Sequence, residues 1–145
     1  KVFRITMMVV AISALACTSK KHEASEKDHE ISGETWSEMD NFHMIMAESF
    51  HPFKDSSNLE PAIKNSEAMA AAADRWASAS MPERVDNEET KVKLQQLRDA
   101  ASAFDELVKS GDPHEIGNSL TELHDLFHEL QEEWYGAAGG HEEHH

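Results

Sequence analysis

Four stretches of the chain carry large apolar residues at intervals of three and four, the spacing that gathers them on one face of an α-helix. Polar and charged residues fill the positions between them. The apolar positions are Trp36, Met39, Phe42 or His43, Met46 and Phe50; then Leu59, Ile63, Met69, Ala73 and Trp76; then Leu94, Leu97, Ala101, Phe104 and Val108; and last Ile116, Leu120, Leu123, Phe127, Leu130 and Trp134. This pattern predicts four amphipathic helices.

Capping and helix-breaking residues delimit the predicted helices. The expected start and stop signals are, in chain order, Thr35 with Glu38 and then Pro52; Asn58 with Pro61 and then the Ser80-Met81-Pro82 segment; Asp86 with Glu89 and then Gly111; and Asp112 with Pro113 and Glu115 and then Gly136. Short connections between amphipathic helices favour antiparallel neighbours. We therefore expect an all-α domain over residues 33–136, folded as an antiparallel up-down-up-down four-helix bundle.

The first sixteen residues have the pattern of a signal peptide. Lys1 and Arg4 precede an uncharged apolar run that is too short to span a membrane. The following segment "SALAC" is similar to a bacterial lipobox with Ala14 and Leu15 in the reverse of the usual order. We expect an exported protein, periplasmic or held at the outer membrane by a lipid on Cys17. Cleavage near Ala16, giving a free secreted protein, is the alternative.

The segments on either side of the predicted bundle are polar. Residues 17–32 are charged and almost free of large apolar side chains, which predicts a disordered tether between lipid and domain. Residues 137–145 are rich in glycine, histidine and glutamate and predict a flexible tail. The expected organisation is a signal peptide (1–16), a tether (17–32), the bundle (33–136) and a tail (137–145).

The charge balance narrows the range of partners. With 13 basic and 28 acidic side chains the formal net charge is −15, which repels nucleic acid and anionic lipid and concentrates cations. We therefore expect no nucleic-acid partner and membrane contact only through the lipid anchor; no protein partner is indicated. The single cysteine excludes an internal disulfide, a cysteine-based zinc site and covalently attached c-type haem.

Histidines on the first and last predicted helices form a candidate metal site. His124 and His128 are four residues apart, so both imidazoles share one helix face. We assume that the end of the first helix lies beside the start of the last. Residues of these two helices whose numbers sum to about 165 then share a level, meaning the same height along the bundle axis. His43 then lies within one turn of His124, and Met39 lies between the levels of His124 and His128. Three imidazoles with a nearby thioether suit copper, zinc or nickel.

Further residues belong to weaker alternatives. Met46 is a second candidate thioether ligand. Asp125 or Glu122 is expected to orient a ligand imidazole by accepting a hydrogen bond from the ring nitrogen that does not bind the metal. The same level rule places His51 opposite His114, as a secondary metal site. His51 lies about 12 Å along the helix from His43, too far to share its ion. The competing interpretation makes these histidines surface or core-edge side chains without a ligand.

A di-iron centre and a non-covalent haem are the other cofactors that four-helix bundles hold. A di-iron centre needs inward carboxylates on all four helices, and the two middle stripes contain none. Non-covalent haem between Met39 and His124 or His128 is a more serious alternative. The aromatic residues of the first and last stripes leave no obvious slot for it.

Two segments resemble a largely uncharacterised group of exported bacterial four-helix (lipo)proteins. These are "HMIMAESFHP", with the pattern His-x-x-Met-Ala-x-x-Phe-His-Pro, and "LHDLFH", with the pattern Leu-His-Asp-x-Phe-His. The resemblance covers about residues 39–131 and implies that His43, His51, His124 and His128 act together at a metal site. There is also a distant likeness to the cytochrome c prime and soluble cytochrome b bundles.

The sequence thus predicts an exported, non-catalytic bundle that binds a transition metal for buffering or resistance. No nucleophile, phosphate-binding loop or pair of buried acids indicates an enzyme. A haem b electron-transfer protein and a structural or partner-binding envelope lipoprotein are the alternatives.

Overall fold

The computed structural model describes residues 35–139, which form four α-helices and one short 3-10 helix. The helices are α1 (Ser37–Ser56), α2 (Glu60–Ser78), α3 (Glu88–Leu107) and α4 (Pro113–Gly139), and η1 (Glu83–Val85) precedes α3. No strand occurs in this part of the chain. The predicted all-α fold is confirmed. The predicted signal peptide, lipidated Cys17, tether and most of the tail lie outside the described residues.

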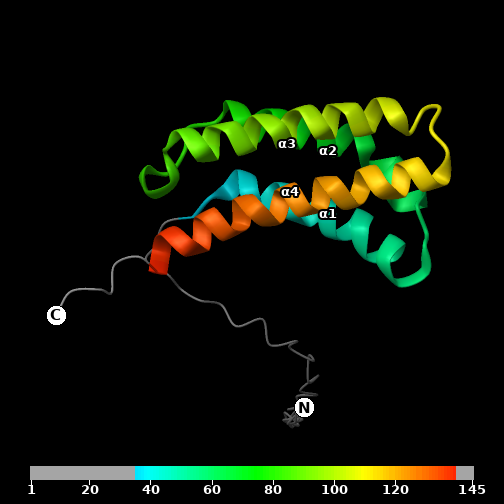
Figure 1. Ribbon diagram of the computed structural model, residues 1–145, viewed down its shortest axis with the longest axis horizontal. Coiled ribbons are helices and arrows are strands. Elements are labelled where there is room, and N and C mark those ends of the chain that lie inside the picture. Colours follow the sequence, from blue (N-terminus) through cyan, green and yellow to red (C-terminus); the bar gives the residue numbers. More distant parts are fainter. Residues whose placement is uncertain (1–34, 140–145) are drawn as a thin grey trace, which may run out of the picture.

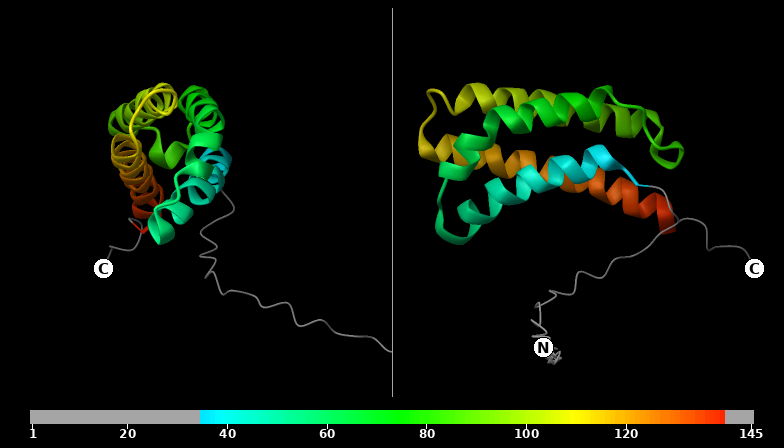
Figure 2. Two further views of the ribbon diagram at one scale, coloured as in Figure 1. Left: turned by 90° about the vertical axis from the view of Figure 1, so that its right-hand side faces the viewer. Right: turned by 180° about the vertical axis from the view of Figure 1, so that it is seen from behind.

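The helices run alternately up and down, and each packs against the next in the sequence (Figure 1). Seen from one end they surround a common core, and α4 returns beside α1 (Figure 2). The α1–α4 seam has fewer close backbone approaches than the other three helix pairs. This arrangement is the predicted four-helix bundle, with one seam less tightly closed than the rest.

The two ends of α1 differ from the prediction. Trp36 is the N-cap and makes no side-chain cap hydrogen bond, so the expected Thr35–Glu38 capping box is wrong. The helix also continues through Pro52 to Ser56 instead of ending at His51. A proline this near the end of a helix removes one backbone hydrogen bond. The Pro52 carbonyl is still satisfied, because the Ser56 hydroxyl donates to it at 2.9 Å.

Packing of Phe53 accounts for the extra turn of α1. This half-buried ring lies against the core and against Gly117 of α4. Ser57 then closes the helix in the left-handed conformation, with φ 57°. Its N–H donates to the Phe53 carbonyl at 2.7 Å, and the Asn58 N–H donates to the Pro52 carbonyl at 3.2 Å. Tertiary contact and this C-terminal cap together outweigh the local preference of proline.

The other helix ends lie close to their predicted positions, with two exceptions. Asp112 caps α4 as expected, accepting from the N–H groups of His114 and Glu115. The cap of α3 is Asn87, not Asp86, and its side chain accepts from the Thr90 N–H at 2.9 Å. Gly136 does not end α4, which runs on to Gly139.

The core consists of nearly all the predicted apolar stripes. All six predicted positions of α4 are buried, as are the five large apolar positions of α1 that begin with Trp36. On α2, Ile63 is 42% exposed and the smaller Ala62 and Ser66 face inward, so the predicted position of Ile63 is wrong. Val85 of η1 is also buried, and Arg84 lies over the Trp134 ring, 3.1 Å from its centroid.

Candidate functional site

A small hollow lies on the α1–α4 seam, between two points where these helices are held together. At one end Phe53 packs closely on Gly117, and at the other Trp36 and Trp134 have ring centroids 5.6 Å apart. The hollow has a volume of about 100 Å³. Its lining consists of His43, Met46, Ala47, Phe50 and His51 from α1, and His124, Phe127 and His128 from α4. Four histidines, from two segments that are far apart in sequence, therefore share one surface depression.

His124 and His128 are in direct contact. Their Nε2 atoms are 3.1 Å apart, and their ring planes meet at 73°. One ring nitrogen donates a hydrogen bond to the other in this arrangement. The regular helix accounts for the contact, because positions four residues apart lie on the same face one turn apart. The predicted pairing of the two imidazoles is present in the structure.

Aromatic stacking fixes the ring of His124. The Phe50 ring lies parallel to it at 12°, with centroids 3.7 Å apart. His43 stacks in a similar way on Phe127, at 20° and 5.1 Å. Phe50 and Phe127 are themselves buried in the core. The bundle interior thus supports the imidazoles from beneath, while His43, His51 and His128 remain exposed.

The surroundings of His124 favour its neutral form. Burial of the ring lowers the pKa of His124, and the positive charges of His128 and His51 lower it further. A hydrogen bond with Asp125 and the charge of that carboxylate act in the opposite direction. Nδ1 of His124 lies 3.5 Å from the Asp125 carboxylate. A proton held on Nδ1 by this carboxylate leaves Nε2 with a free lone pair, which is the form that binds a metal.

The helix register differs from the predicted one. The stacked pairs Phe50–His124 and His43–Phe127 show that residues sharing a level on α1 and α4 have numbers that sum to about 170–174, not 165. The prediction placed the end of α1 at Pro52. The additional turn to Ser56 shifts α1 along α4 relative to that prediction. His51 therefore lies close to the level of His124, and His43 lies at the level of His128. The predicted position of His51 opposite His114 is wrong.

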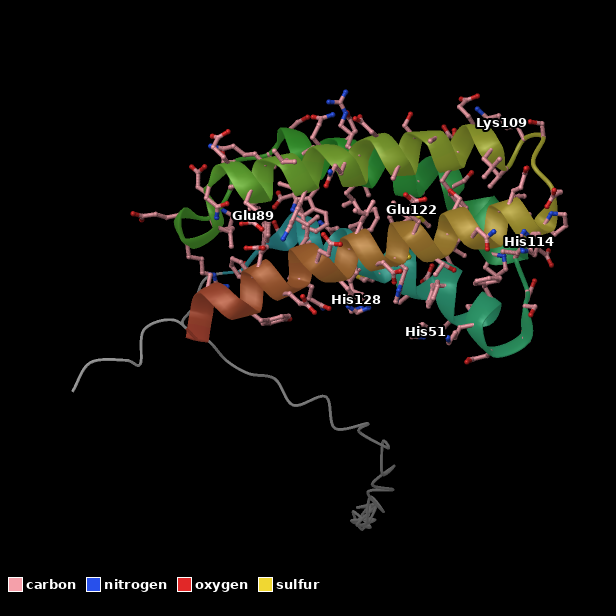
Figure 3. The ribbon with its side chains drawn as sticks, in the orientation of Figure 1. His51, Glu89, Lys109, His114, Glu122 and His128 are labelled. Atoms are coloured by element: carbon pink, nitrogen blue, oxygen red, sulfur yellow. The ribbon has the colours of Figure 1, made fainter. Side chains whose placement is uncertain are left out.

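The remaining predicted residues are distributed as follows. Met46 lines the hollow and is 1% exposed, whereas Met39 is buried in the core and does not line it. His114 is exposed near the start of α4, where its Nδ1 is 3.2 Å from the Asn118 amide nitrogen. Figure 3 shows His51 and His128 on one edge of the bundle, with His114 apart from them near the start of α4. Glu122 is exposed and does not line the hollow.

The predicted triad of His43, His124 and His128 is not assembled. Within residues 35–139, no three histidine, cysteine, aspartate or glutamate side chains converge closely enough to hold an ion as they stand. What the structure provides is one preformed pair with two further histidines on the opposite wall. A third ligand therefore requires the rotation of an exposed side chain.

Phe50 and Ala47 are site residues that the sequence interpretation did not identify. The apolar pattern predicts only a core position for Phe50 and assigns no role to Ala47. Their signal lies in the helical spacing from His43, since positions 47, 50 and 51 follow it by four, seven and eight residues on the same face. The small side chain at position 47 leaves space for the hollow.

No protein-family model, curated protein or solved structure matches this chain. In the described part of the chain, none of the helices combines the length and apolar character needed to cross a membrane. The geometry of the histidines is therefore the basis for proposing a function.

Proposed function

We propose that this chain is an exported, lipid-anchored four-helix bundle that binds a transition-metal ion and acts in metal buffering or resistance, without catalysis. The observation that carries the proposal is the 3.1 Å separation of the Nε2 atoms of His124 and His128. Two imidazole nitrogens this close together, on successive turns of one helix, can form a chelating pair for a metal ion.

The separation of these nitrogens matches the demands of a metal ion. With metal–nitrogen bonds of 2.0–2.1 Å, two nitrogens 3.1 Å apart subtend roughly 95–102° at the ion. Tetrahedral and square-planar ions require angles in or near this range. The separation therefore allows one ion to replace the hydrogen bond once the rings turn their lone pairs toward it.

The donors around the hollow indicate which ions fit. Imidazole nitrogen suits zinc, copper and nickel, and the thioether of Met46 adds a soft donor that favours Cu(I). Carboxylates, which magnesium and calcium prefer, do not line the hollow. The acidic surface of the chain attracts cations of all these kinds, so selectivity comes from the histidines.

The size of the hollow argues against haem at this position. Sites for organic ligands of moderate size occupy ~300–1,000 Å³, whereas this hollow has about 100 Å³. Haem would have to displace Phe50 or Phe127, both buried in the core. The other alternative, a structural envelope lipoprotein, makes no use of the histidine pair and predicts no specific metal affinity.

Metal binding is tested on the full chain carrying alanine at the five histidines of its terminal segments, His22, His29, His141, His144 and His145. We expect calorimetric titration with Zn²⁺, Ni²⁺ and Cu²⁺ to show one site, which His124→Ala together with His128→Ala abolishes. His114→Ala is the matched control, because this exposed histidine lies on the same helix outside the hollow. Equal affinity in the double variant and the control contradicts the proposal.

Export and lipidation are tested separately. The full-length precursor is produced in a bacterial host, and we expect incorporation of labelled palmitate into the envelope fraction. Cys17→Ser removes the expected acceptor and should abolish the label. Labelling that persists in this variant, or an unlabelled protein with Cys17 present, contradicts a lipid anchor without affecting the metal site.

A further inference from the structure

The third ligand of the proposed ion can be assigned from the ring contacts of the two α1 histidines, an inference that rests on the proposed metal-binding function. His43 and His51 both line the hollow, but they lie eight residues apart on α1, about 12 Å along its axis. One ion bound to His124 and His128 can therefore recruit only one of them.

Two observations favour His51. It directly follows Phe50, whose ring lies 3.7 Å from that of His124. It is also exposed, and no ring contact holds it, whereas the His43 ring is stacked flat on Phe127. Turning His43 toward the ion would break that stack, and turning His51 breaks no such contact.

The contact between Phe53 of α1 and Gly117 of α4 determines the position of His51. Gly117 lies inside α4, where glycine costs about 1 kcal/mol relative to alanine. Its replacement has no room, because a Cβ at this position would lie 2.9 and 3.0 Å from Cζ and Cε2 of Phe53. Phe53 is two residues after His51 and belongs to the turn of α1 that continues past Pro52. Its seating on Gly117 holds the end of α1 against α4.

We propose that His51 is the third ligand of the ion held by His124 and His128, and that Phe53 seated on Gly117 positions it. The resulting site has three imidazole ligands, and its fourth position is open unless the Met46 thioether occupies it, as proposed for Cu(I). An open fourth position allows a donor from another molecule to enter and take the ion. This arrangement suits an ion that is exchanged with a partner more than one that is permanently enclosed.

The ligand assignment is tested by electron paramagnetic resonance of the Cu²⁺-loaded full chain, in the background lacking terminal histidines. We expect nitrogen hyperfine structure from three imidazoles in the parent protein and in His43→Ala, and from two in His51→Ala. Affinity should fall about tenfold or more in His51→Ala. Loss of a nitrogen in His43→Ala but not in His51→Ala overturns the assignment.

The positioning role is tested with a pair of matched glycine substitutions in α4. Gly117→Ala should weaken Cu²⁺ binding about tenfold, whereas Gly136→Ala, where a Cβ meets nothing within 4 Å, should leave binding unchanged. Leucine lacks the Cζ and Cε2 atoms that clash, so Phe53→Leu combined with Gly117→Ala should recover most of the affinity. Circular dichroism establishes that each variant is folded.

The outcomes separate this inference from the function on which it rests. Parent-like affinity in folded Gly117→Ala, or no recovery in the double variant, overturns the positioning role. Failure of the His124→Ala and His128→Ala double variant to lose the metal overturns the proposed function itself. If His51→Ala and His43→Ala both bind like the parent while that double variant does not, the ion has two protein ligands and the third-ligand assignment is wrong.

Discussion

The ring of Phe50 on α1 lies parallel to that of His124 on α4, with the two centroids 3.7 Å apart. Phe50 is 8% exposed and belongs to the core, so its position is determined by packing on several helices. Through this stack the core determines the direction of the His124 ring, and with it the position of Nε2 beside His128. The candidate site is therefore coupled directly to the hydrophobic core.

Replacing Phe50 by leucine tests this coupling. We expect the affinity for Zn²⁺ or Cu²⁺ to fall several-fold, because the His124 ring loses the surface that orients it. The free energy of unfolding should fall by about 1–2 kcal/mol through lost packing. The control is Phe104→Leu on α3, which removes a fully buried ring away from the hollow. A loss of affinity of the same size in both variants would show that general destabilisation explains it.

The thioether of Met46 is expected to contribute to the choice of ion. Met46→Leu keeps nearly the same volume and should cost less than about 1.5 kcal/mol of stability. We expect Cu(I) affinity to fall about tenfold while Zn²⁺ affinity is unchanged, because sulfur prefers the softer ion. Met39→Leu, a buried methionine on the same helix that does not line the hollow, should change neither. A parallel loss of Zn²⁺ affinity in Met46→Leu would indicate a packing effect.

The stability of the metal-free protein should fall as the pH drops below the ordinary pKa of histidine, about 6.5. Burial lowers the pKa of His124 in the folded state, with smaller contributions from the charges of His128 on α4 and His51 on α1; Asp125 opposes them. The unfolded chain therefore binds more protons than the folded one just below that pH, and protonation favours unfolding. Chemical denaturation at pH 7.5 and pH 5.5 measures the difference.

His124→Gln provides the comparison for this pH dependence. It removes the titrating ring and should flatten the profile between these two pH values, while His114→Gln should leave the slope as it is in the parent. Identical slopes in all three proteins would mean that other groups carry the pH dependence.

A buried hydroxyl links α2 to α3 at a point remote from the histidines. Ser66 donates to the Asp105 carboxylate at 2.7 Å, and this bond, more than the neighbouring Lys109, lowers the pKa of Asp105. The stabilisation is present above the ordinary pKa of aspartate and is lost as the pH falls through the lowered value. Ser66→Ala should therefore cost about 1 kcal/mol at pH 7. The cost should shrink in strong acid.

Denaturation of this variant at pH 7 and pH 2.5 measures that difference. Ser102→Ala, at an exposed position of α3, is the control and should have little effect at either pH. A cost in Ser66→Ala that is equal at both pH values would mean that Asp105 plays no part in it. The metal affinity of Ser66→Ala should match that of the parent, because Ser66 does not line the hollow.

Local sequence determined the fold class, because the apolar spacing of three and four residues requires helices and four such stripes require a shared core. It also determined the Asp112 cap and the buried face of α4, from Ile116 to Trp134, which depend on neighbouring residues alone. The His124–His128 contact belongs to the same class. Helical geometry places both rings on one face, one turn apart, and the Phe50 stack then sets the direction of the His124 ring.

Tertiary structure decided the end of α1, the α1–α4 register and therefore which residues line the hollow between these helices. From local signals Pro52 ends the helix, but the contact of Phe53 with Gly117 stabilises another turn. That turn shifts α1 along α4 and brings His51 close to the level of His124 and His43 to that of His128. Such a shift depends on a contact between residues 64 positions apart, and helical periodicity within one segment contains no information about it.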